Sequence, residues 1–312
     1  MSTLTIQDTF QGLFAAAPEN FTSARQVGKE SFLAQGLPAV KSEEYKFTNI
    51  SKKLDSNISA FQPAAIFEVG EEEIKAAVFA GFEGDVLVFT NGHFRPELSS
   101  QIDGLTVSKL SAIADLALGS IAKADKDPFA ALNQASFQDG IFIEVSKKTQ
   151  VEKPILLLSF NQANQGQVIQ PRVWIEVGDF AEVKFLDQSI SLGDNSYFVN
   201  KVVEIKGGVN SQISFYRIQD EGKNAIEVST LETDIQRDAR FTSVNLSLSG
   251  DMVRNNLNLN LLGSNSEGNM YGVYLLNGKT QRDEVGRVVE PGRDGNAQGE
   301  VLRRQARPYA GR

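Results

Sequence analysis

The sequence contains no cysteine and a single histidine, His93. Zinc sites, haem sites and thiolate-ligated clusters take their ligands from cysteine and histidine, so this chain alone cannot hold such a centre in the ordinary way. The same absence excludes a disulfide framework. A carboxylate site for Mg²⁺ or Ca²⁺ stays open, although the chain has no Asp-x-Asp-x-Asn-Gly loop.

The chain also lacks an excess of positive charge and long apolar runs. Its net charge of −8 argues against nucleic-acid binding, because phosphate contacts need a basic surface. No apolar run approaches the roughly 20 residues of a membrane span. The N-terminus carries Asp8 before any basic residue and has no long apolar core, so it does not read as a secretory signal. We therefore expect a cytoplasmic protein without a membrane segment.

What the chain has in quantity is short β-type runs between residues 140 and 281. Most alternate apolar and polar residues with a period of two, as in Arg172 to Val177, which is typical of strands buried on one face. The runs are 141–145, 154–160, 172–177, 181–186, 198–205, 211–218, 225–232, 239–248, 252–262 and 270–276.

Two architectures fit these runs. A sandwich or barrel would normally show two-residue Asn-Gly or Asp-Gly turns between paired runs, and between these runs only Gly207-Gly208 approaches that signal. Gly and Asn at the breaks suit a parallel β-helix, in which each turn stacks on the next. The pattern alone favours the β-helix only slightly.

Residues 1–139 predict an N-terminal helical and mixed region. Asp127 and Pro128 are an N-cap and a first helical residue, and Asn91-Gly92 predicts a hairpin turn after a strand at Asp85–Thr90. Helices are expected at Ile6–Ala17, from Thr22 or Ser23 to Gln35, at Glu71–Phe79, at Val107–Leu118 and at Phe129–Phe137.

Three aromatic residues in this region need an interpretation. Tyr45 and Phe47 lie in a segment dense in charge, and we expect them to anchor the helices to the β body. His93 follows the Asn91-Gly92 turn and has no Ser, Asp or Cys context for a triad, so we expect a structural place in the turn.

The last 31 residues differ in composition. Residues 282–312 contain seven Arg and no Lys, whereas the first 281 contain seven Arg and 17 Lys. Apolar periodicity stops as well. We predict an irregular or disordered tail, and a truncation or frameshift after about residue 281 is one explanation.

Two short patterns resemble functional motifs, and we assign a function to neither. Gly278-Lys279-Thr280 lacks the glycine that a phosphate-binding loop needs five residues earlier, where Val273 stands. The asparagines at positions 255, 256, 258 and 260 predict corner and outward-facing positions of neighbouring strands, with amides paired in ladders.

Many short segments, taken together and in order, carry a family resemblance. The chain resembles the SufB/SufD family of iron–sulfur cluster assembly scaffolds, and within it the SufD members, over roughly residues 1–281. The matching segments include 36–38, 43–48, 87–94, 127–133, 139–140, 153–155, 171–172, 200–202, 218–219, 254–257 and 272–276.

The resemblance implies a right-handed parallel β-helix behind an N-terminal helical region. It also implies a non-catalytic scaffold of a SufBCD-type complex, which pairs with SufB and with the ATPase SufC and carries an iron–sulfur cluster only transiently. This chain alone is then expected to bind no cofactor. A homodimer is a further possible assembly.

The resemblance stops where the family continues with further turns, a histidine- and aspartate-bearing stretch and a C-terminal helical domain. It therefore assigns no catalytic, cofactor-binding, metal or partner-binding residue to this sequence. We expect weak binding to the ATPase and an open strand edge prone to aggregation.

A second function class stays open on the residues themselves. A carbohydrate-active β-helix enzyme, such as a polysaccharide lyase, needs acidic and basic side chains grouped on one face. Asp234, Arg237, Asp238 and Arg240 are candidates, although their spacing also fits a solvated strand edge.

Overall fold

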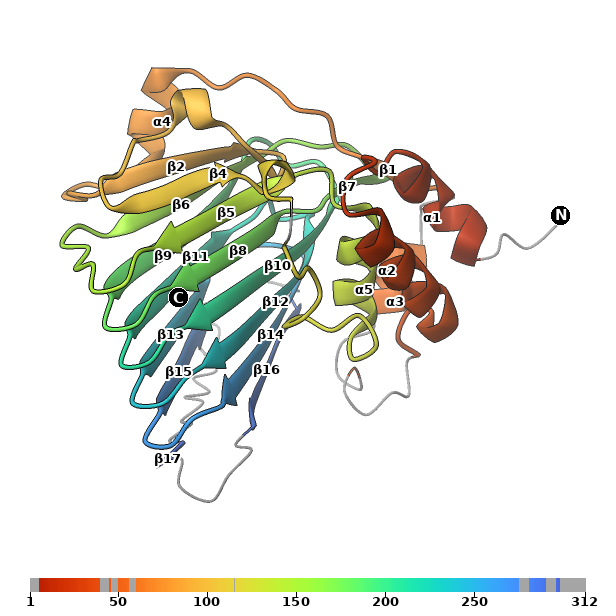
Figure 1. The fold of residues 1–312 in the computed structure, drawn as a ribbon. Coiled ribbons are helices and arrows are strands. Elements are labelled where there is room, and N and C mark those ends of the chain that lie inside the picture. The colour runs from red at the N-terminus through yellow and green to blue at the C-terminus, as the bar shows by residue number, and fades with distance from the viewer. Residues whose placement is uncertain are drawn as a thin grey trace, which may run out of the picture.

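The computed structural model describes residues 6–39, 45, 50–55, 60–114, 116–274, 281–289 and 296–297. Within these residues a β coil carries a small helical region on one side (Figure 1). The helices are α1 (Ile6–Ala15), α2 (Thr22–Gln35), α3 (Ile50–Asp55), α4 (Glu71–Ala77) and α5 (Pro128–Ser136), with 3₁₀ turns η2 (Pro96–Leu98) and η3 (Leu110–Ala112).

The strands form two sheets, here called sheet A and sheet B. Sheet A has the order β16-β14-β12-β10-β8-β5-β4 with β1 and β7 beside it, and sheet B has the order β17-β15-β13-β11-β9-β6-β2-β3. Sheet A contains β1 (Gln62–Pro63), β4 (Leu105–Lys109), β5 (Gly140–Val145), β7 (Gln167–Ile169), β8 (Arg172–Val177), β10 (Phe198–Gly207), β12 (Ile226–Ile235), β14 (Met252–Leu261) and β16 (Gln281–Val289). Sheet B contains β2 (Asp85–Thr90), β3 (His93–Phe94), β6 (Ile155–Asn161), β9 (Glu182–Ser191), β11 (Gln212–Asp220), β13 (Arg240–Ser247), β15 (Glu267–Tyr274) and β17 (Asn296–Ala297).

Successive strands of the coil alternate between the two sheets. From β8 onward every strand pairs in parallel with the strand two places later, so each turn adds one strand to each sheet. This is a parallel β-solenoid of about five turns, and the β-helix prediction is confirmed over the sandwich.

The register stacks like residues on like residues inside the coil. Val173, Val203, Leu231 and Leu257 are partners in four successive strands of sheet A, and all are buried. Phe185 and Phe215 face them from sheet B, with ring centroids 6.5 Å apart. The alternation read from the sequence therefore places one apolar row from each strand in the interior.

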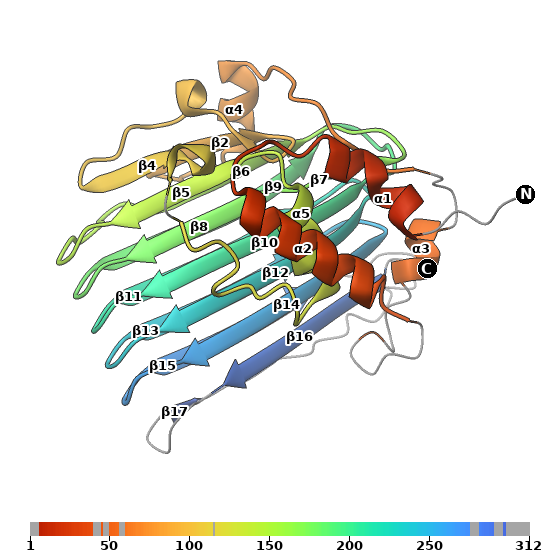
Figure 2. The ribbon, with the colours of Figure 1, turned by 45° about the vertical axis from the view of Figure 1, so that its right-hand side comes forward.

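The helical region packs on the outer face of sheet A at the start of its strands. Figure 2 shows α2 and α5 in front of β10 and β12, and α5 contacts both strands. An aromatic cluster joins the layers, with Phe129 and Phe198 at 6.0 Å between ring centroids. Asp127 caps α5 by accepting from the backbone N–H groups of Phe129 and Ala130 at 2.8 Å, as the sequence predicted.

Two expectations are wrong. The helix predicted at Val107–Leu118 is β4 followed by η3, because Leu105–Lys109 pairs antiparallel with β5 and completes the edge of sheet A. The irregular tail predicted from residue 282 is wrong for Gln281–Val289, where β16 continues the register of β14. Asn296–Ala297 is β17, and the other residues after 289 lie outside the described part.

Candidate functional site

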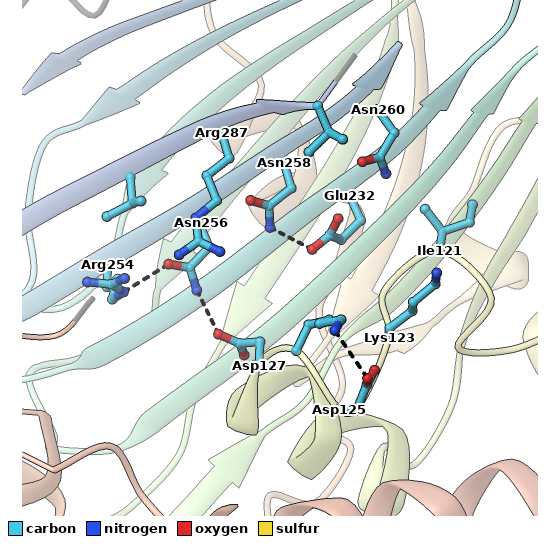
Figure 3. A pocket seen from close by; sticks show the side chains of 13 residues that line it. Ile121, Lys123, Asp125, Asp127, Glu232, Arg254, Asn256, Asn258, Asn260 and Arg287 are labelled. Atoms are coloured by element: carbon cyan, nitrogen blue, oxygen red, sulfur yellow. Dashed lines mark hydrogen bonds and ion pairs between the residues drawn. The ribbon is translucent and has the colours of Figure 1, made fainter. Parts of the chain in front are cut away.

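A cavity of about 410 Å³ opens on the outer face of sheet A, between β12, β14, β16 and the segment that leads into α5 (Figure 3). We call it the charged groove. It is lined by Ile121, Lys123, Asp125, Lys126, Asp127, Glu232, Arg254, Asn256, Asn258, Asn260, Val285, Arg287 and Val289. Its size and its converging polar groups are typical of a ligand or partner site.

The floor of the charged groove is built by alternate residues of β14 and their partners on β12. The Asn258 amide donates to Glu232 Oε1 at 2.6 Å, and the Asn260 amide donates to Asp234 Oδ1 at 2.9 Å. Asn256 donates to Thr230 Oγ1 at 3.3 Å. The parallel register sets these pairs, because residues 230, 232 and 234 are the direct partners of 256, 258 and 260.

The asparagine prediction is therefore only partly right. All four asparagines lie on the single strand β14, and the amides bond to hydroxyl and carboxyl oxygens of β12 rather than to one another in a ladder. Asn255 points into the coil instead, where it accepts from Arg217 at 3.1 Å.

Two residues that line the charged groove, Asp127 and Arg254, contact Tyr45 of the helical region. The Arg254 guanidinium lies 3.9 Å from the centroid of the Tyr45 ring and forms an ion pair with Asp283 of β16. The Tyr45 hydroxyl donates to Asp127 Oδ2 at 2.9 Å. Tyr45 thus anchors the helical region to the coil as predicted, and Phe47 lies outside the described residues.

Burial changes the protonation of the acids at this site. Burial, opposed by the Asn258 hydrogen bond and reinforced by nearby carboxylates, raises the pKa of Glu232 to about 8. Burial also raises the pKa of Asp127 and that of Tyr45. At neutral pH Glu232 is thus mainly a neutral acid, able both to donate and to accept a hydrogen bond.

A fully buried ion pair lies between the helical region and the outer face of sheet A. Arg172 Nε lies 3.0 Å from Glu204 Oε1, and both side chains have no exposed surface. Arg172 also donates to Asn133 of α5 at 3.1 Å, and Glu204 accepts from the Ala122 N–H at 2.9 Å. These bonds fix α5 and the segment before it against sheet A.

Comparison with known proteins places this architecture. Residues 6–157 match the model of the SufBD protein N-terminal region, and residues 160–301 match that of the SUF system FeS cluster assembly SufBD core domain. The chain belongs to the SufBD family. The core match includes the whole solenoid from β7 onward and continues past residue 281, where the basic-residue usage changes.

Curated relatives in the SufBD family are similar at low identity. An iron–sulfur cluster assembly SufBD family protein of Synechocystis sp. is 25% identical over 267 residues, which cover 79% of this chain and 58% of that protein. A second one from the same organism is 27% identical over 192 residues, 57% of this chain and 38% of the relative. A SufBD family protein of Staphylococcus epidermidis is 26% identical over 221 residues, which cover 69% of this chain and 47% of that protein. The chain spans about half the length of these relatives.

Of the four residues singled out for a carbohydrate-active enzyme, the structure places Arg237, Asp238 and Arg240 around one surface cavity of this SufBD protein, and Asp234 lies outside it. Asp234 lies in sheet A beside Asn260, whereas Arg240 starts β13 of sheet B and pairs with Glu267. Arg237 forms an ion pair with Asp238 at the corner between the sheets. The basic and acidic side chains at this corner are paired in exposed ion pairs, and the second acid of the set, Asp234, faces another cavity.

His93 and the rejected phosphate loop add no site. His93 lies in β3, directly after the Asn91-Gly92 turn, and burial lowers its pKa. Residues 278–280 lie outside the described part. Among the described residues, no group of three or more His, Cys, Asp or Glu side chains is placed to hold a metal ion. No helix in the described ranges has the length and apolar content needed to span a bilayer.

The coil interior holds a network of buried charged side chains that the sequence analysis did not predict. Lys201 pairs with Asp187, Arg217 Nε lies 3.7 Å from Asp187 Oδ2, and Arg217 also pairs with Glu227. All four side chains are buried. The available signal was Lys201 itself, which takes an inward place in the alternation of Phe198–Gly207.

Proposed function

We propose that this chain is a non-catalytic scaffold subunit of a SufBCD-type iron–sulfur cluster assembly complex in the cytosol. On this proposal it pairs with a SufB-like subunit and a SufC-like ATPase. The observation that carries the proposal is the match of the solenoid to the SufBD core domain, together with relatives named as iron–sulfur cluster assembly proteins.

The chemistry of the sequence supports a scaffold role rather than cluster ligation. Iron–sulfur clusters are held mainly by cysteine thiolates, and the 312 residues contain no cysteine. The single imidazole, His93, is partly buried in the first hairpin. A cluster handled by the complex would then be cargo whose thiolate ligands come from another subunit.

Long parallel strands suit this role physically. Each turn buries its apolar row against its neighbours, so the coil is stiff and can present extended outer faces to other chains. The charged groove and the outer rows of both sheets are such faces. A rigid platform of this kind holds partner subunits in a fixed relative geometry without supplying reacting groups.

Co-expression with SufB-like and SufC-like subunits from one organism, followed by size-exclusion chromatography with light scattering, tests the proposal. We expect this chain to co-elute with both subunits at a defined stoichiometry. Elution of the chain alone, as a monomer or a homodimer, in the presence of both subunits would contradict it.

A further inference from the structure

The outer face of sheet B carries two apolar rows that run across its strands. The parallel register makes Leu186, Tyr216, Val244 and Tyr271 direct neighbours on β9, β11, β13 and β15. In the next row, Ile218, Leu246 and Val273 follow Gln188 in the same way. Alternation along each strand points these side chains away from the coil interior.

The first part of this face is already covered by a helix of the same chain. Ile74, Ala77 and Val78, in and after α4, pack on a cluster that contains Leu156 and Leu158 of β6 and extends to Leu186 of β9. The Gln188 amide donates to the backbone carbonyl of Ala77 at 3.2 Å. Figure 1 shows α4 at the end of the coil where β2 and β6 lie.

Beyond β9 the same two rows continue across β11, β13 and β15. None of the described apolar clusters includes Tyr216, Ile218, Val244, Leu246 or Val273. Tyr271 is 37% exposed and Val273 is 46% exposed, and the members of the two rows on β11 and β13 are half-buried. Contiguous exposed apolar patches on soluble proteins commonly mark interaction sites.

We propose that these rows, from β11 to β15, form a docking surface for an amphipathic helix of a partner subunit, which continues the layer that α4 begins. We call this surface the outer apolar face, defined by Tyr216, Ile218, Val244, Leu246, Tyr271 and Val273. The inference rests on the proposed function, because that function supplies the partner subunits.

The choice of a helix follows from the neighbouring interface. The two rows continue, in direct register, the rows of β6 and β9 that lie under α4. They therefore have the same spacing and are again mainly apolar. A helix places residues i, i+3, i+4 and i+7 on one such apolar strip. The bordering row, which contains Lys184, Ser214, Thr242 and Asn269, is polar, so the apolar strip ends there and the docked helix does not extend over this row.

Site-specific photo-cross-linking tests the proposal in the reconstituted complex. Benzoylphenylalanine replaces Tyr271, the complex with SufB-like and SufC-like subunits is isolated by size exclusion, and cross-linked peptides are mapped by mass spectrometry. We expect cross-links from position 271 to a helical segment of a partner. If the complex forms but position 271 cross-links only to a second copy, only to a non-helical segment or to nothing, the proposal is overturned.

A matched pair of charged variants gives the affinity readout. We expect Tyr271→Lys to weaken partner binding by about tenfold or more, since it places a charge in the apolar strip. Asn269→Lys adds the same charge to the same strand, one row away, and should change binding by less than about twofold. Equal effects of the two variants would overturn the proposal.

An arm without partner subunits separates this inference from the proposed function. A synthetic peptide of residues 66–82, which contains α4 and its apolar flanks, is added to the isolated chain that carries the photo-cross-linker at 271. Cross-linking by this peptide and not by a scrambled version supports a helix-binding face even if the complex fails to form. Absence of peptide cross-linking when the complex also fails to form counts against the face.

Discussion

At the scale of single residues, the protein relies on charged groups buried in pairs across turns of the coil. Arg172 and Glu204 lie on β8 and β10, which are neighbours in sheet A because the chain has made one full turn between them. Lys201 and Asp187 lie on opposite sheets and pair across the interior of the coil. Isolated buried charges are costly, so each partner is stable in place only while the other is present. The outward pairs, such as Arg240 with Glu267, are half exposed and carry little energy.

Arg172→Ala tests the buried pair. The substitution leaves Glu204 without its cation at a position with no exposed surface, so we expect the free energy of unfolding to fall by about 3–5 kcal/mol. Arg240→Ala removes a comparable but exposed pair and should cost less than about 1 kcal/mol. Urea unfolding measures both, and similar losses for the two variants would show that burial does not set the energy.

Glu232 predicts a pH dependence with a definite sign. The pKa of Glu232 is about 8 in the folded protein against an ordinary value of 4.5, so the folded state keeps a proton that the unfolded chain releases between these values. The Glu232 contribution to stability is therefore full below about pH 4.5 and is lost as the pH rises towards 8.

Glu232→Gln removes this titration while it keeps an acceptor for the Asn258 amide. We expect the stability of the variant relative to the natural protein to increase from pH 5 to pH 8, by on the order of 2–4 kcal/mol. Urea unfolding at several pH values gives the comparison. A stability difference that is the same at both ends of the range would contradict the raised pKa of Glu232.

At the scale of elements, the sequence predicted helix starts and turns correctly where neighbouring residues alone determine them. Asp127 with Pro128 marked the start of α5, and Asn91-Gly92 marked the β2–β3 turn. The helix predicted at Val107–Leu118 failed because Leu105–Lys109 gains its hydrogen bonds from β5, more than 30 residues later in the chain. The spacing of apolar residues in one segment carries no information about a partner strand so far away in the sequence.

Asp127→Ala tests the cap of α5. The carboxylate accepts two backbone N–H groups and the Tyr45 hydroxyl, so we expect its removal to lower the free energy of unfolding by about 1–3 kcal/mol. Asp127→Asn keeps an acceptor oxygen, and burial already disfavours the charge by raising the pKa of Asp127. The asparagine variant should therefore lose clearly less stability, and an equal loss would point to the charge rather than the cap.

At the scale of the whole molecule, ten of the solenoid strands were predictable as strands, and their parallel stacking followed from the family resemblance. The charged groove was not predictable, because it joins residues 121–127 to side chains of β12, β14 and β16. Period-two patterns say which residues face outward but not which distant loop covers them. The strand β16 was missed because its apolar residues, including Val285 and Val288, are sparse among charges.

The central claim is that this chain supports cluster assembly without ligating the cluster, and iron content tests it most directly. After anaerobic reconstitution with iron and sulfide, the isolated chain and its complex with SufB-like and SufC-like subunits are separated by size exclusion and assayed for iron and for cluster absorbance. The account predicts cluster on the complex and none on the isolated chain. A stable cluster on the isolated chain, which has no cysteine, would contradict it.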